Sequence, residues 1–206
     1  MTRIPIHPGA VDWTGENPGI YLKETEDGPW TGLMCFFRIM VSPHGRGHGV
    51  VLLDQPNVAK GLPEVENFCI SDNEPLARYL VDGYFAKFAS FKVSPGLGAM
   101  TYLPLTGVSR SGETSPGSSY VETVASADYE VVSTWNDLGE AFAVELPKAN
   151  TATGRHEMFS LFIEAPDASV TVNGRPLTGK VFPRDFNGRT SSCAFLAFSE
   201  SWVLAV

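Results

Sequence analysis

The sequence has no long apolar run. No window approaches the roughly 18 consecutive apolar residues of a membrane-spanning helix. The N-terminal stretch MTRIPIHPGAVDW also lacks the apolar core of a signal peptide. We therefore expect a soluble protein that is not exported and does not enter a membrane.

Cysteine is scarce. Cys35, Cys69 and Cys193 are odd in number, lie in apolar runs typical of strands and form no CxxC pair. A disulfide framework needs an even set of cysteines in an oxidising compartment. The sequence therefore predicts buried, reduced thiols in a cytoplasmic protein.

Basic residues are few and scattered. Fifteen Lys and Arg stand against 23 Asp and Glu, which gives a net charge of -8. Proteins that bind nucleic acid or anionic lipid gather their basic residues in a patch or stripe. We therefore expect neither partner.

The motifs that cradle nucleotide phosphates, GxGxxG and GxxxxGK[ST], are absent, and no GxSxG element opens a helix after a strand. We therefore expect no cofactor and no serine triad. Hydrophobic residues make up 43% of the chain and charged residues 18%, which is typical of a packed globular domain. With 206 residues, the simplest organisation is a single domain spanning residues 1–206.

Many short strands are indicated, because glycine and proline separate runs rich in Val, Phe, Thr and Tyr. This pattern predicts a mainly β (α+β) fold, a single-domain β-barrel or closed β-sandwich with one principal helix. We expect the segment 109–119 to be a surface loop. The predicted strands are 19–24, 31–42, 48–54, 65–71, 99–105, 119–125, 128–135, 140–146, 157–164, 168–172, 177–182 and 192–205.

The principal helix is predicted over about residues 74–88. Asp72 or Asn73 can cap it, and Pro75 suits its first turn. Apolar residues recur behind them at helical spacing. They are Leu76, Tyr79, Leu80, Tyr84 and Phe88.

Two hairpins can be placed. Asn173-Gly174 favours a type I′ turn that pairs Val172 with Arg175. In SPHGRGHG, a turn at 45–47 would set His44 opposite His48 and Arg38 opposite Asp54, with the alternate residues of both strands forming a core face.

His44 and His48 would then lie close enough to share a metal ion. A zinc or iron site needs a third or fourth protein ligand, which this spacing does not provide. The alternative interpretation is a polar turn with both histidines in water.

Glu200 interrupts an apolar strand near the C-terminus. In AFLAFSESWVLAV, one alternating face contains Phe198, Glu200 and Trp202. A carboxyl group held there would have a raised pKa and could act as a general acid or base. The alternatives are a strand bend that turns Glu200 outward and an ion pair with a residue such as Arg184.

Lys87 lies among aromatic residues in GYFAKFASFK. If the helix continues past Gly83, its phase places Lys87 on the apolar face, where an amine has a lowered pKa and becomes nucleophilic. If the helix ends there, the amine reaches solvent.

The run Asp72-Asn73-Glu74-Pro75, followed by Phe85-Ala86-Lys87-Phe88-Ala89, resembles the acetoacetate decarboxylase family. In that family a similar acidic-amide-Pro run precedes a Phe/Tyr-Pro-Lys-Lys element whose first lysine forms a Schiff base. The resemblance covers about twenty residues, and Ala86 and Phe88 replace the family's proline and second lysine. It implies that Lys87 condenses with a β-keto acid while Glu74 or Glu200 positions the acid.

Taken together, the sequence predicts a β protein that binds a small organic molecule, with Tyr84, Phe88 and Trp202 lining its site. A lyase acting on keto acids through Lys87, with no cofactor, is the catalytic form of this hypothesis. The alternatives are a metal-dependent enzyme centred on His44 and His48, and a non-catalytic binding or assembly module. A homodimer could form through exposed strand edges.

Overall fold

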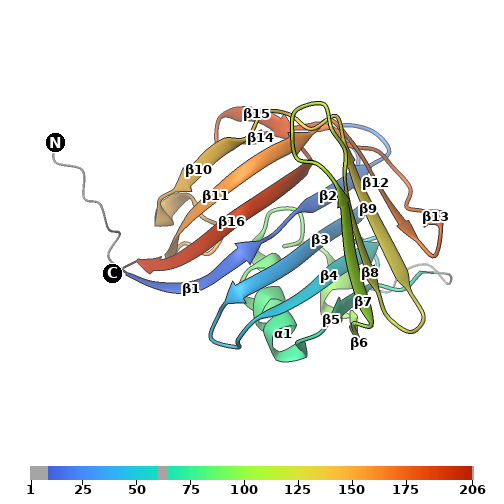
Figure 1. Cartoon of the computed structure of the whole chain (residues 1–206), viewed down its shortest axis with the longest axis horizontal. Helices are drawn as coiled ribbons and strands as arrows, with labels where there is room; N and C mark the ends of the chain where they lie inside the picture. Colours follow the sequence, from blue (N-terminus) through green and yellow to red (C-terminus); the bar gives the residue numbers. More distant parts are fainter. Residues whose placement is uncertain (1–8, 60–64, 206) are drawn as a thin grey trace.

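The fold is mainly β with one principal helix (Figure 1). The computed structural model describes residues 9–59 and 65–205. The largest sheet has nine strands. Its order is β10 (Phe142–Leu146), β11 (His156–Ala165), β16 (Ala194–Ala205), β1 (Gly9–Glu16), β3 (Trp30–Val41), β4 (Gly47–Asp54), β5 (Phe68–Ser71) and β6 (Thr101–Pro104), and β2 (Gly19–Lys23) follows β1 in the space between β16 and β3.

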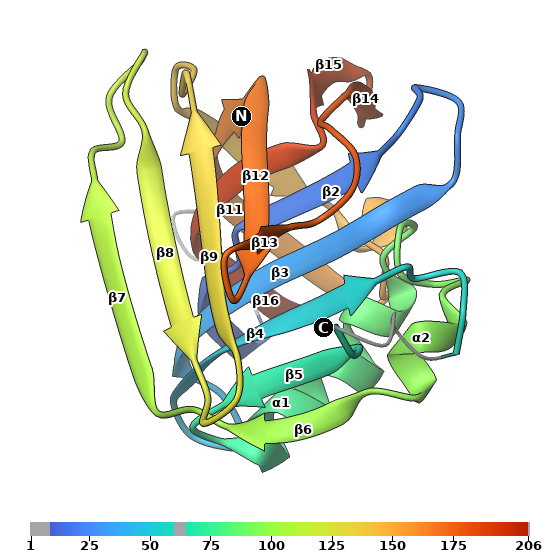
Figure 2. The same cartoon turned by 90° about the vertical axis from the view of Figure 1, so that its right-hand side faces the viewer.

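A second sheet of five strands packs on the first, and its strands cross those of the large sheet steeply in Figure 2. A two-stranded sheet follows it in the chain. The second sheet has the order β13 (Arg175–Pro176), β12 (Asp167–Val172), β9 (Glu130–Asn136), β8 (Tyr120–Ala125) and β7 (Gly107–Gly112), and the small sheet pairs β14 (Pro183–Phe186) with β15 (Arg189–Ser192). Within the described residues, the first and last strands of each larger sheet do not pair with each other, so neither sheet closes on itself.

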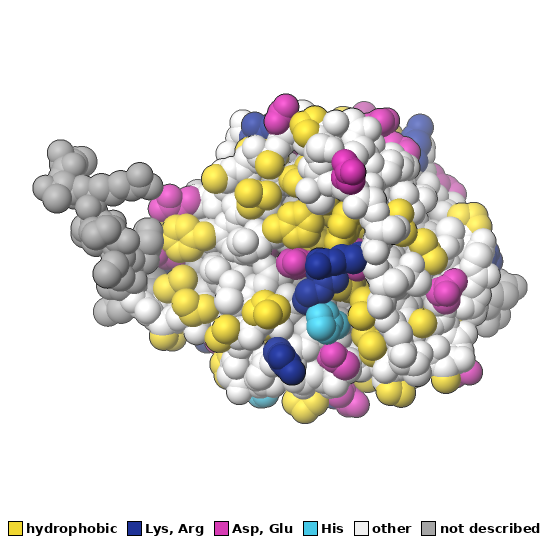
Figure 3. Space-filling model, in the orientation of Figure 1, with side chains coloured by type: hydrophobic (Ala, Val, Ile, Leu, Met, Phe, Trp, Pro, Cys, Tyr) yellow, Lys and Arg dark blue, Asp and Glu magenta, His cyan; other side chains and the backbone are white. Residues whose placement is uncertain are grey.

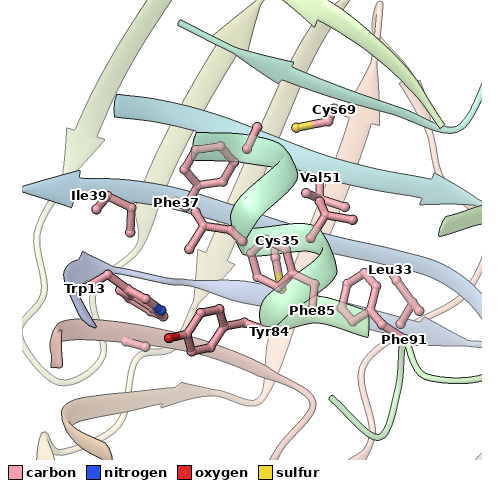
Figure 4. Close-up of a cluster of buried hydrophobic side chains, with 14 of the residues drawn as sticks. Trp13, Leu33, Cys35, Phe37, Ile39, Val51, Cys69, Tyr84, Phe85 and Phe91 are labelled. Atoms are coloured by element: carbon pink, nitrogen blue, oxygen red, sulfur yellow. The ribbon is translucent and has the colours of Figure 1, made fainter. Parts of the chain in front are cut away.

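Both faces of the large sheet are buried, so successive residues of β3 and β4 enter two different cores. Met34, Phe36 and Val50 meet Val131 and Trp135 of the second sheet. The opposite face packs against α1 (Glu74–Gly83) and the segment after it (Figure 4). The residues labelled in Figure 4 come from both sides of this contact. The sheet contributes Trp13, Leu33, Cys35, Phe37, Ile39, Val51 and Cys69, and the segment after α1 contributes Tyr84, Phe85 and Phe91. Cys193 is buried as well, and all three thiols are free.

An ion cluster joins the two sheets at their edge. Arg38 of β3 pairs with Glu16 of β1 and, at 3.1 Å, with the buried Glu122 of β8. In Figure 3, which views the molecule from the same side as Figure 1, basic, acidic and histidine side chains gather near the centre of the surface. Removing one partner would leave a buried charge uncompensated, so we assign this cluster a structural role.

The principal helix is shorter than predicted. Asn73 caps it, since its side chain accepts a hydrogen bond of 3.1 Å from the backbone of Leu76. The helix ends at Gly83, because Tyr84 leaves the helical conformation, and a 3₁₀ turn, η1 (Phe85–Lys87), follows. Gly83 weakens the last turn. The apolar pattern of the sequence extends beyond Gly83 although the α-helix does not. The reason is that Tyr84 and Phe85 enter the core from the tighter turn that follows.

The predicted register of the β3–β4 hairpin is wrong. Arg38 lies opposite His48, and Asp54 lies opposite Gly32, so His44 does not face His48. The loop at 42–46 is longer than the predicted turn at 45–47, because it contacts the start of α1. Asn73 donates to the carbonyls of His44 and Arg46 at 2.9 and 3.0 Å. The shift is an even number of residues, so the predicted core face is still buried except for Val41 at its end.

Most other predicted strands are present. The Asn173-Gly174 hairpin pairs Val172 with Arg175, and both turn residues have positive φ angles, 50° and 77°. Strand β7 occupies part of the predicted loop, and the predicted strand 177–182 is replaced by β14 further along the chain. No helix in the described ranges is long and apolar enough to span a membrane.

Candidate functional site

A cavity of about 300 Å³ opens on the face of the large sheet that carries α1. Its base is formed by β2, β11 and β16, and its walls by the segments after η1 and before β11 and by β14. Six of the 18 lining residues are aromatic, and several of their rings pack on one another. They are Tyr21, Phe88, Phe162, Phe186, Phe195 and Trp202.

A bulge in β16 brings Glu200 to this cavity. Ser199 has a φ of 51°, and Ser199 and Glu200 together occupy the place opposite Ser160 between the pairs Leu161–Phe198 and Phe159–Ser201. One extra residue reverses which side chains face the cavity. Glu200 and Trp202 therefore share the face of Phe195, whereas the uninterrupted alternation predicted them beside Phe198.

Glu200 is 3% exposed and lacks a cationic partner among the described residues. Its Oε1 accepts hydrogen bonds from Trp202 Nε1 at 2.7 Å and from Asn17 Nδ2 at 3.4 Å. Burial raises the pKa of Glu200 to about 7, and the two hydrogen bonds offset part of this effect. The carboxyl is therefore able to take up or release a proton near neutral pH.

Arg184 of β14 lines the same cavity. Its guanidinium lies over the rings of Phe195, Phe186 and Tyr21, with its central carbon 4.6, 5.3 and 5.6 Å from their centroids. It forms neither an ion pair nor a hydrogen bond within the part of the chain that the structure describes. The predicted alternative of a Glu200–Arg184 pair is therefore wrong.

The other predicted site residues are dispersed. Phe88 and Trp202 line the cavity, whereas Lys87 is exposed and is not among its lining residues. Glu74 pairs with Arg78 at 2.8 Å in a shallow surface depression elsewhere. Tyr84 is buried behind Trp202, their ring centroids 5.0 Å apart.

The two histidines of the hairpin have separate partners. The ring of His44 packs against Tyr79, with centroids 4.8 Å apart. His48 Nδ1 lies 3.3 Å from Asp72 Oδ2. Within residues 9–59 and 65–205, no group of three His, Cys, Asp or Glu side chains could hold a metal ion.

A second polar cluster, centred on Asp12, was missed by sequence reasoning. Asp12 accepts hydrogen bonds from Tyr79, from Tyr84 at 2.5 Å and from His156 Nε2 at 2.8 Å. His156 is fully buried, and its Nδ1 lies 2.9 Å from Thr153 Oγ1. Burial would raise the pKa of Asp12, but the three hydrogen bonds outweigh it, so this pKa is lowered. Burial lowers the pKa of His156, against the opposing effect of Asp12.

This Asp12 cluster joins β1, α1 and β11 behind the cavity wall, where the His156 and Trp202 rings are in contact. Its members are far apart in the sequence and belong to no spacing motif, so only the folded chain reveals them.

No protein-family model matches this chain, and no curated protein matches it at a significant level. The resemblance of the segment 72–89 to the acetoacetate decarboxylase family therefore stays a prediction, and the candidate site rests on its own geometry.

Proposed function

We propose that this mainly β protein binds a small organic molecule with an aromatic or bulky apolar body in the cavity described above. The observation that carries the proposal is Glu200, a carboxyl buried without a cation in an aromatic-lined space. Burying a carboxyl group without a charged partner is costly, and a purely structural core would use an apolar residue there.

The cavity has the features of a small-molecule site. Ligand pockets are concave and mostly apolar, with a few polar groups that orient the ligand. A volume of about 300 Å³ lies at the lower end of the range for such pockets. Asn17, Arg184 and Glu200 are among its polar groups, together with Ser90, Asn150, Thr151, Asp185 and Asn187.

Binding in this proposal needs no covalent step. The Schiff-base chemistry implied by the family resemblance would require the amine of Lys87 to reach the ligand, and this exposed residue lies outside the cavity lining. The proposal is accordingly a binding function, with proton transfer by Glu200 as the chemistry that the cavity itself could add.

The experiment is a thermal-shift screen of small aromatic acids, amines, alcohols and amino acids, followed by calorimetric titration of the molecules that stabilise the protein. Three variants accompany the wild type. Ala152→Trp fills the cavity from an exposed lining position, Glu200→Gln removes the charge, and Glu145→Gln alters an exposed carboxyl on β10.

The proposal expects ligands that bind wild type and E145Q equally and that bind A152W at least tenfold more weakly. If no compound in the screen binds, or if A152W leaves the affinity of the ligands unchanged, a binding function for this cavity is rejected. E200Q then reports whether the buried carboxyl takes part in binding.

A further inference from the structure

Two groups of opposite charge border this cavity without pairing with each other. Glu200 has no cation within ion-pair distance, and Arg184 has no carboxylate, in the described parts of the chain. Arg38 and Arg175, in contrast, each pair with a buried carboxylate, Glu122 and Asp54 respectively. The cavity therefore contains an unpaired anionic group and an unpaired cationic group that a ligand can reach.

The Glu200 side of the cavity presents acceptors. Both hydrogen bonds to Glu200 reach Oε1, so Oε2 has no donor among the described residues. Asn17, which donates to Oε1, has its side-chain oxygen buried without a hydrogen-bond partner and is only 5% exposed. Unpaired buried acceptors are costly, so they call for a donor on the ligand. An ammonium group supplies several donors and also balances the carboxylate.

The Arg184 side presents donors. Its guanidinium lies over the rings of Phe186 and Phe195, and its N–H groups have no hydrogen-bond partner among the described residues. A guanidinium with a free edge recognises a carboxylate through two parallel hydrogen bonds. The aromatic rings that line the same cavity suit an apolar or aromatic ligand side chain.

We propose that the ligand is a zwitterion, a small amino acid with an aromatic or bulky apolar side chain. Its ammonium is received by Glu200 and Asn17, its carboxylate by Arg184, and its side chain by the aromatic lining. The inference rests on the proposed binding function and adds the class of ligand. A simple acid would leave Glu200 without a partner, and a simple amine would leave Arg184 without one.

Calorimetric titration at pH 8 with three related probes tests this inference. L-phenylalanine carries both charges, 3-phenylpropanoate lacks the ammonium and phenethylamine lacks the carboxylate. Leucine and tryptophan, as both enantiomers, extend the test to other side chains. We expect at least one amino acid to bind tenfold or more tightly than its acid and amine analogues.

Two variants locate the charges. In Glu200→Gln the amino acid should lose its advantage over the acid, and in Arg184→Met it should lose its advantage over the amine. Circular dichroism and unfolding temperature verify that each variant is folded, and Glu145→Gln should behave as wild type.

Each contrary result is informative. An acid or amine that binds as tightly as its amino acid would overturn the zwitterion while leaving the proposed binding function intact. Failure of every amino acid to bind at 10 mM, in the same experiment, would overturn it as well. The wider screen and the A152W variant test the binding function separately.

Discussion

Trp202 donates a hydrogen bond to Glu200 just after the bulge at Ser199 in β16, with the indole nitrogen 2.7 Å from Oε1. The residues lie two positions apart on a strand, so their side chains share a face. This contact holds the carboxyl against the aromatic wall of the cavity.

The titration of Glu200 should make the protein less stable as pH rises. Its pKa is about 7 in the folded protein against an ordinary 4.5, so the folded state binds the proton more tightly. The free energy of unfolding should therefore fall between pH 4.5 and about 7, by about 3 kcal/mol at full titration. Urea unfolding across this range should show the decline in wild type and lose it in Glu200→Gln. A parallel pH dependence in both proteins would exclude a raised pKa.

Ligand binding should respond to pH in the opposite sense. An ammonium ligand favours ionised Glu200, so L-phenylalanine should bind about tenfold more tightly at pH 8 than at pH 6. Burial raises the pKa of the neighbouring Tyr21 and of Cys35, the latter to about 12, so these groups stay neutral. In Glu200→Gln the affinity should not change over this range, and a persistent tenfold change would assign the effect to another group.

The Asp12 cluster should contribute to stability. Asp12→Asn replaces the charged acceptor of Tyr79, Tyr84 and His156 by a neutral amide. The free energy of unfolding measured in urea should therefore fall by about 1 to 3 kcal/mol. The pKa of Asp12 is lowered in the fold, so this stabilisation is present above its unfolded value and is lost on acidification. Asp27→Asn, at an exposed position, is the matched control. Equal stability of the two variants would show that the cluster is dispensable.

The bulge should tolerate glycine but not a β-branched residue. Ser199 has a positive φ of 51°, which glycine adopts freely and valine adopts at a cost. Ser199→Gly should match or exceed wild-type stability, while Ser199→Val should lose about 1 kcal/mol or more. Thermal unfolding of the pair measures this difference, and a more stable valine variant would contradict the assigned backbone conformation.

Lys87 should not form a Schiff base. Its side chain is exposed and outside the cavity lining, so it lacks the desolvation that activates a catalytic lysine. Borohydride reduction in the presence of a panel of β-keto acids, followed by peptide mass mapping, should give no stoichiometric adduct at Lys87. A specific adduct there would restore the decarboxylase-like hypothesis.

The sequence predicts the fold where one local signal dominates. The capped start of α1 at Asn73 and the Asn173-Gly174 hairpin depend on side chains within a few residues, and both are present. The register of β3 with β4 depends on contacts between the loop and Asn73, which is distant in the sequence. The end of α1 depends on how Tyr84 enters the core, and β1 carries too few apolar residues for its strand to be recognised.

The same distinction applies to the site. The sequence indicates Glu200 and Trp202 because a carboxyl interrupts an apolar run, although the bulge at Ser199 reverses the face they occupy. The sequence indicates Arg184 only as a possible partner of Glu200, because no local pattern shows that its guanidinium packs on aromatic rings. The Asp12 cluster unites residues of three elements and leaves no local signature.

The most direct test of the central claim is a binding titration of wild type and Ala152→Trp with the tightest ligand from the screen. Ala152 is an exposed residue at the cavity, so the indole can fill the space without replacing a core side chain. If the cavity is the binding site, the affinity of A152W falls at least tenfold while its unfolding temperature stays near that of wild type. Equal affinity of the two folded proteins would contradict the account.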